Sequence, residues 1–208
     1  MDTTEKLDLI VTEAWKIFNH QFLNGRIQVE KEAPFQHHLA NIIRDLGNLY
    51  CFSRSETFIV DLETKELNIR KKNKFIDITF GFYDGPKLLA KAAMELKFKK
   101  KIQGAEDFAR IDSYQDIESL EYFLERGYSN AYFCMIADDL IYSKASKIAT
   151  TGDIFSMREG YVTPINIPIS NANCKGRKDV IVMFKKAHTF EWQVQNGYLF
   201  LCMFLHKD

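Results

Sequence analysis

Apolar side chains recur at helical spacing through residues 4–23, which predicts an N-terminal helix with one hydrophobic side. The Asn24-Gly25 pair then ends this helix, because both residues favour helix ends. A second helix is expected from Pro34 to about Gly47. Proline suits the first turn of a helix, and glycine commonly follows the last turn.

A shorter period begins after the second helix. Residues 57–62 alternate between apolar and polar side chains and predict a strand. The polar run 63–66 is interpreted as a turn, after which residues 67–70 pair back. Two more alternating stretches, 75–80 and 93–98, are joined by the turn-forming residues 83–87.

In the second half of the chain, the polar stretch up to Ala109 reads as a loop. Ser113 with Asp116 resembles a capping arrangement and predicts a helix that runs to Arg126-Gly127. Residues 130–137 form a nearly unbroken apolar run, typical of a central strand covered on both faces.

The C-terminal part holds a long segment, residues 142–178, with no regular pattern, for which a role in recognition is only a guess. Residues 180–184 read as a strand. Asn196-Gly197 between apolar runs predicts a hairpin over residues 189–205. We expect these added strands to extend the sheet.

Three charged residues lie on the polar sides of the two alternating strands. A hairpin centred on Pro86 places Asp77 opposite Glu95, with Cβ atoms about 4.5–5.5 Å apart, although a bulge or a turn of different length would break this pairing. Lys97 follows on the same face, about 6.5 Å along the strand. The cluster fits either a charge ladder across two strands or a metal site.

The metal-site interpretation rests on elementary electrostatics. Two close carboxylates repel each other unless a cation lies between them. Mg²⁺ prefers oxygen ligands and keeps several waters. The amine of Lys97 can then orient or deprotonate a water and offset charge that builds up on a phosphate. This chemistry is that of metal-dependent phosphodiester cleavage.

Asp77 followed by Glu95-Leu96-Lys97 resembles the core motif of the PD-(D/E)XK nuclease superfamily, which includes many restriction endonucleases. The resemblance covers residues 34–138, and Ile76 stands where the family pattern has proline. It implies that Asp77, Glu95 and the Leu96 carbonyl bind Mg²⁺, with Mn²⁺ as a substitute, and that Lys97 assists catalysis.

The resemblance also implies a restriction-endonuclease-like α/β fold. Its core is a helix, three antiparallel strands, a helix and a strand, here extended by the N-terminal helix and by C-terminal strands in a mixed sheet. A Glu or Gln on the first core helix often completes the metal site in this superfamily. Gln36 is the leading candidate and Glu32 a weaker one. Alternatively, Glu32 favours the positive helix terminus and Gln36 is a solvated neighbour of the apolar stripe.

Two basic clusters flank the expected site. They could contact DNA phosphates, or they could form an ordinary solvated sheet edge. Because the net charge is zero, any nucleic-acid contact must come from such local patches. The first cluster is Lys99, Lys100 and Lys101, and the second is Arg70, Lys71, Lys72 and the nearby Lys74.

Size and composition agree with one globular domain over residues 1–208, since 46% of the side chains are hydrophobic and 27% are charged. Four cysteines lack zinc-type spacing, and we expect them to be mainly buried free thiols. The absence of a long apolar run predicts a cytoplasmic protein without a membrane partner.

The sequence therefore predicts a Mg²⁺-dependent endodeoxyribonuclease acting in restriction, defence or repair, with a homodimer as a possible assembly by family analogy. The alternative is a catalytically inactive nuclease-like module that binds nucleic acid or protein.

Overall fold

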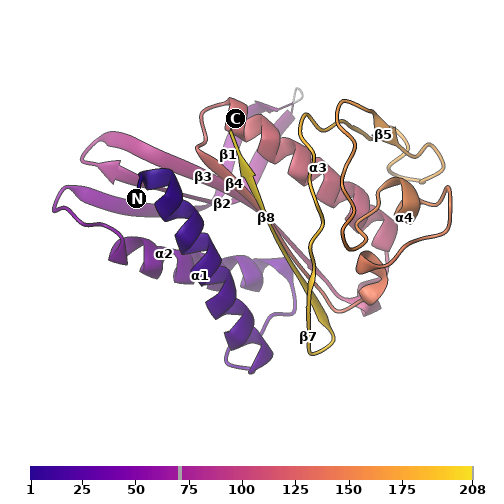
Figure 1. Ribbon diagram of the computed structural model, residues 1–208, viewed down its shortest axis with the longest axis horizontal. Coiled ribbons are helices and arrows are strands. Elements are labelled where there is room, and N and C mark those ends of the chain that lie inside the picture. Colours follow the sequence, from indigo (N-terminus) through magenta and orange to yellow (C-terminus); the bar gives the residue numbers. More distant parts are fainter. Residues whose placement is uncertain (70–71, 208) are drawn as a thin grey trace. The chain divides into compact units, whose positions relative to one another are not determined.

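The computed structural model describes residues 1–69 and 72–207, and Figure 1 shows its helices and strands. The helices of this part of the chain are α1 (Thr3–Leu23), α2 (Glu32–Leu49), α3 (Glu106–Glu125) and α4 (Thr151–Ile154), with short 3₁₀ helices η1 (Lys101–Gln103) and η2 (Leu140–Ser143). The strands are β1 (Glu56–Ile69), β2 (Lys72–Asp84), β3 (Lys87–Lys99), β4 (Asn130–Ala137), β5 (Ile169–Ser170), β6 (Ile181–Val182), β7 (Gln193–Gln195) and β8 (Tyr198–His206).

Six of these strands form one sheet in the order β1-β2-β3-β4-β8-β7, and β5 pairs with β6 in a separate sheet. The chain divides into two compact units. The first unit contains the described residues up to Leu96, Tyr122–Tyr132 and those from Phe204 on; the second contains Lys97–Glu121 and Phe133–Met203. The strands β3, β4 and β8 have residues in both units.

In the first unit, α1 packs against α2, and α2 packs against β1 (Figure 1). The rings of Phe18 and Phe35 lie 5.0 Å apart between the two helices. Gly47 allows α2 to approach β1 closely, because a Cβ at this position would lie 2.0 Å from the Phe58 ring. The helix begins at Glu32 rather than at Pro34, which still lies in the first turn where its missing N–H costs little.

The strand β1 is continuous, so the predicted turn at residues 63–66 is wrong. Glu63 has a φ of 52°, and β1 keeps the same register with β2 on both sides of it, with Leu62 opposite Ile78 and Thr64 opposite Ile76. One residue of the polar run thus has a left-handed conformation, but the antiparallel pairing continues, and the register shift of this strand pair lies between Glu66 and Ile69.

The strands β2 and β3 are antiparallel, with pairs from Ile78–Met94 to Phe82–Ala90. These pairs have the register expected of a hairpin centred on Pro86. The register arises differently, however: Asp84 pairs with Lys87 across a two-residue turn, and a register shift between Phe82 and Tyr83 then restores the expected pairing.

The strand β4 runs parallel to β3. The Ser129 N–H donates to the Lys91 carbonyl at 2.7 Å in the first unit, and the Asp138 N–H donates to the Lys99 carbonyl at 3.2 Å in the second. Residue numbers rise together along this pair, whereas β1, β2 and β3 alternate in direction. The predicted α/β class with a mixed sheet is therefore confirmed, and α3 makes the crossover that a parallel pair requires.

In the second unit, α3 begins at Glu106, so the predicted start near Ser113 is wrong. Ser113 lies inside the helix, and its hydroxyl donates to the Ala109 carbonyl at 2.7 Å. The Ser-x-x-Asp pattern matched a cap by composition alone, because the polar residues before it are helical as well. The predicted buried strand is confirmed, since all of β4 is buried.

The C-terminal hairpin is confirmed, and β7 and β8 extend the main sheet. Asn196 and Gly197 have φ values of 50° and 83°, as a tight hairpin turn requires. The expectation that residues 180–184 also extend this sheet is wrong, because β6 pairs with β5. Glu118 holds this segment against α3 by accepting the Met183 N–H at 2.9 Å.

All four cysteines are free thiols; Cys134 and Cys174 are buried, and Cys51 and Cys202 are half-buried. None of the helices in the part of the chain that the structure describes has the length and apolar character needed to cross a bilayer.

Candidate functional site

Asp77 lies near the middle of β2, where its side chain reaches the neighbouring strand. Its Oδ2 atom accepts a hydrogen bond from the Leu96 N–H at 2.6 Å. Ile78 of β2 pairs with Met94 of β3, and these two residues are the direct neighbours of Asp77 and Glu95. The fold therefore brings the Asp77 carboxylate to the Glu95-Leu96 segment, as the predicted register requires.

Gln36 connects α2 to the same point. Its side-chain amide nitrogen donates to the Asp77 carbonyl at 2.6 Å and to Glu63 Oε1 at 2.9 Å. Both amide hydrogens have acceptors, so the side chain has a defined orientation. Gln36 thus lies beside the main chain of Asp77, while Glu32 is the first residue of α2.

Glu95 is 2% exposed, although it is an acid on a strand. The Lys74 ammonium lies 3.2 Å from Glu95 Oε1 and 6.0 Å from the centre of the Phe123 ring. A buried carboxylate is costly unless a cation accompanies it. In the first unit, Lys74 supplies a positive charge at this carboxylate.

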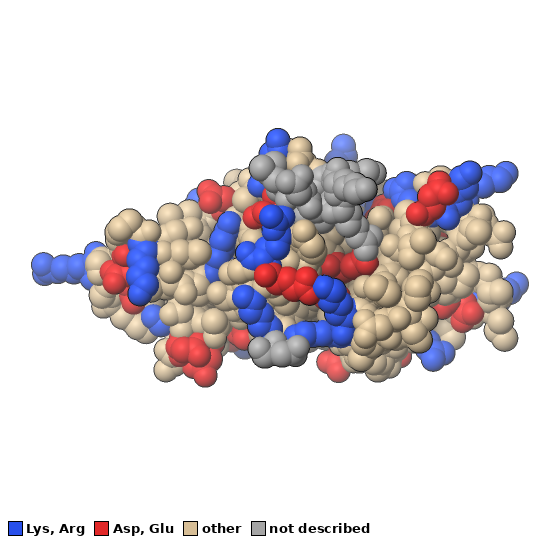
Figure 2. All heavy atoms as spheres, turned by 90° about the horizontal axis from the view of Figure 1, so that it is seen from above, with Lys and Arg blue, Asp and Glu red and all other residues tan. Residues whose placement is uncertain are grey.

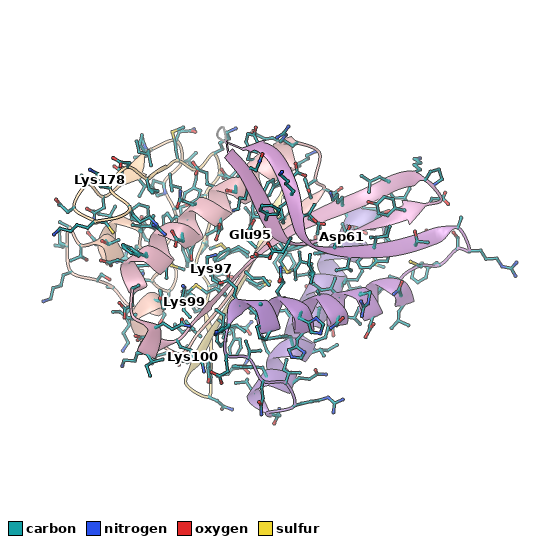
Figure 3. All side chains as sticks on the ribbon, turned by 180° about the vertical axis from the view of Figure 1, so that it is seen from behind. Asp61, Glu95, Lys97, Lys99, Lys100 and Lys178 are labelled. Atoms are coloured by element: carbon teal, nitrogen blue, oxygen red, sulfur yellow. The ribbon has the colours of Figure 1, made fainter. Side chains whose placement is uncertain are left out.

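Lys97 is two residues beyond Glu95 on β3 and belongs to the second unit (Figure 3). Its ammonium lies 2.7 Å from Asp116 Oδ2 on α3. Asp116 was expected to form part of a helix cap, but it faces Lys97 from within the helix. The sequence contains no signal for this contact, because its two partners are far apart along the chain.

The predicted DNA-binding lysines continue along the same strand. Figure 3 labels Lys99, the last residue of β3, and Lys100, which follows it. Both are half-buried, while Lys101 is exposed at the start of η1. Arg70, Lys71 and the Lys72 side chain lie outside the described residues. On the face shown in Figure 2, a row of acidic side chains crosses the centre, and basic side chains lie on both sides of it.

Asp77, Glu95 and the Leu96 carbonyl are the predicted metal ligands. Within residues 1–69 and 72–207, no group of three or more His, Cys, Asp or Glu side chains is placed to bind a metal ion. The carboxylates of Asp77 and Glu95 and the Leu96 carbonyl are nevertheless the type of donor that Mg²⁺ prefers. The ammonium beside Glu95 indicates that this environment tolerates a cation.

Comparisons with known proteins give no relative for this chain: no family model, no curated protein and no solved structure matches it. Any functional conclusion must therefore come from the residues themselves.

Proposed function

We propose that this chain is a Mg²⁺-dependent endodeoxyribonuclease of the PD-(D/E)XK type, with Asp77, Glu95 and Lys97 as its principal functional residues. The hydrogen bond from the Leu96 N–H to Asp77 Oδ2, at 2.6 Å, carries this proposal. It brings an acid from β2 to the Glu-Leu-Lys segment of β3, two parts of the motif that are separated in sequence.

The order of elements supports the same conclusion. From α2 onward the chain forms a helix, three antiparallel strands, a helix and a strand. This order is the one that the resemblance implies for a restriction-endonuclease-like core. Gln36 adds support, since it lies on the first helix of that core and contacts Asp77.

The donor set fits the proposed cofactor. Asp77, Glu95 and the Leu96 carbonyl would hold Mg²⁺ through oxygen atoms, and the remaining positions would be left to waters. When bound, the ion would polarise a phosphodiester and activate a water. Lys97 would orient that water and offset negative charge on the phosphate. Lys99, Lys100 and Lys101, with Arg70, Lys71 and Lys72, would contact DNA phosphates.

The test is nicking of supercoiled plasmid DNA by the full chain with Mg²⁺ or Mn²⁺. We expect Asp77→Asn to lower the rate by at least about 100-fold while circular dichroism shows a folded protein. Asp61→Asn is the matched control, because Asp61 is an exposed acid on β1 (Figure 3) and its substitution should leave the rate unchanged.

Two outcomes would contradict the proposal. In the first, wild-type protein leaves plasmid, linear DNA and RNA intact with either ion. In the second, Asp77→Asn and Asp61→Asn cleave equally well, which would assign the activity to a contaminant. Retarded migration of DNA without cleavage would instead support the binding module considered above.

A further inference from the structure

The second unit contains an arginine that is almost fully buried. Arg110 lies on α3 and is 1% exposed. Its Nη2 atom donates to the Ile141 carbonyl at 2.7 Å, and its guanidinium lies 5.1 Å from the centre of the Tyr142 ring. Among the described residues, no group accepts a hydrogen bond from its buried Nη1 atom, and no carboxylate forms an ion pair with it.

This arrangement is costly for a cation. Burial lowers the pKa of Arg110, and the nearby Tyr142, Tyr114, Asp107 and Glu106 only partly oppose the effect. A cation held away from water is stabilised when an anion meets it with hydrogen bonds. The protein itself supplies a carbonyl and an aromatic face to this guanidinium, so its charge is not neutralised by a direct ion pair within the described residues.

Arg110 also lines a pocket. The pocket has a volume of about 330 Å³, and its lining includes Arg110, Lys147, Ser146 and Gly152. The absence of a side chain at Gly152 makes room for the Ser146 side chain next to it. A Cβ there would lie 2.3 Å from Ser146 Oγ and 3.6 Å from Arg110 Nε.

The charges around the pocket indicate the class of ligand. Arg110 and Lys147 supply two cations, and the Ser146 hydroxyl supplies a further donor, which together suit the oxygens of a phosphoryl group. Glu106 and Asp107, also in the lining, are acceptors that suit hydroxyl groups. The volume lies at the small end of the range for ligand pockets, about 300–1,000 Å³.

We propose that this pocket binds a small phosphomonoester that carries hydroxyl groups, such as a sugar phosphate, with its phosphoryl group on Arg110 and Lys147. This site shares no residue with the proposed nuclease site, since its lining includes neither the Asp77–Glu95 cluster nor Lys97.

The experiment is calorimetric titration of the full chain with ribose 5-phosphate, inorganic phosphate and D-ribose. We expect saturable binding of ribose 5-phosphate, weaker binding of inorganic phosphate and none of the neutral sugar. Arg110→Met should abolish binding. Lys147→Glu should weaken it by about tenfold, whereas Lys144→Glu should not, because Lys144 is also an exposed lysine but does not line the pocket.

The comparison of the two lysine variants keeps the test decisive if Arg110→Met does not fold. Equal affinity for ribose 5-phosphate in the wild type, Lys147→Glu and Lys144→Glu would overturn the proposal. Failure of both phosphate compounds to bind the folded wild-type protein would overturn it as well. Both measurements are of ligand binding and not of plasmid cleavage, so failure of this proposal can be distinguished from failure of the proposed nuclease function.

Discussion

Replacing Lys74 by methionine tests whether the Glu95 carboxylate is a cation site. The side chains of Lys74 and Glu95 are 22% and 3% exposed, and their charged atoms lie 3.2 Å apart. Breaking a buried ion pair by removing one partner costs about 3–5 kcal/mol. Because Lys74 keeps some contact with water, we expect Lys74→Met to lower the free energy of unfolding by about 2 kcal/mol.

The opposite substitution should be milder. Glu95→Gln leaves a neutral amide in the buried position, and the Lys74 ammonium can turn toward solvent, so the expected cost is about 1 kcal/mol or less. Lys74→Met should therefore destabilise the protein more than Glu95→Gln. It leaves the Glu95 carboxylate unpaired, and an unpaired charge costs more at the more deeply buried residue.

Magnesium should then separate the variants. An ion that binds only the folded state stabilises it by about 2.7 kcal/mol at 100 times its dissociation constant. In the wild type the ion competes with the Lys74 ammonium, so Lys74→Met should gain about 1 kcal/mol more from Mg²⁺ than the wild type does. Glu95→Gln should gain less than either.

The assay is urea denaturation with and without Mg²⁺, followed by circular dichroism. Lys91→Met is the control, because Lys91 is another half-buried lysine of the first unit and lies over the Tyr128 ring at 4.6 Å. Its response to Mg²⁺ should equal that of the wild type. Identical Mg²⁺ stabilisation of the wild type, Lys74→Met and Glu95→Gln would refute the reasoning.

Three further predictions concern other contacts. Asp116→Asn removes the negative charge that lies 2.7 Å from the Lys97 ammonium; plasmid nicking should fall without being abolished, and an unchanged rate would show that Asp116 does not support the function of Lys97. Burial alone raises the pKa of Glu121, but hydrogen bonds from His188 and the Lys185 and Lys186 N–H groups lower it overall. Its stabilisation is thus present above the unfolded-state pKa and lost as pH falls through the folded-state pKa, so Glu121→Gln should cost about 2 kcal/mol at pH 7 and progressively less below about pH 4 in urea titrations. Gly47→Ala should destabilise by about 2 kcal/mol through its clash with Phe58, although helix propensity favours alanine by about 1 kcal/mol; a higher melting temperature would contradict this.

The part of the candidate site that depends on strand alternation could be predicted from the sequence. Asp77 and Glu95 lie on alternating strands joined by a short turn near Pro86, although the expected pairing also depends on a register shift between Phe82 and Tyr83 that the sequence did not indicate. Local patterns of this kind are sufficient because hairpin partners are close in sequence. The two long N-terminal helices could be predicted as well, because the helical repeat of apolar residues is also a local pattern.

Contacts between distant segments could not be predicted. Asp116 meets Lys97, and the Ile141 carbonyl meets Arg110, only because α3 packs where it does. The continuous course of β1 was missed because its polar run 63–66 has the composition of a turn, although polar side chains also occur on exposed strands. Such features depend on tertiary packing, which overrides local preference.

Asp77 is held at both ends: Gln36 fixes its carbonyl, and the Leu96 N–H fixes its carboxylate. A side chain restrained in this way has already surrendered most of its rotational freedom during folding. A ligand that engages this carboxylate would therefore lose little affinity to ordering it, which is the thermodynamic advantage of a preorganised group.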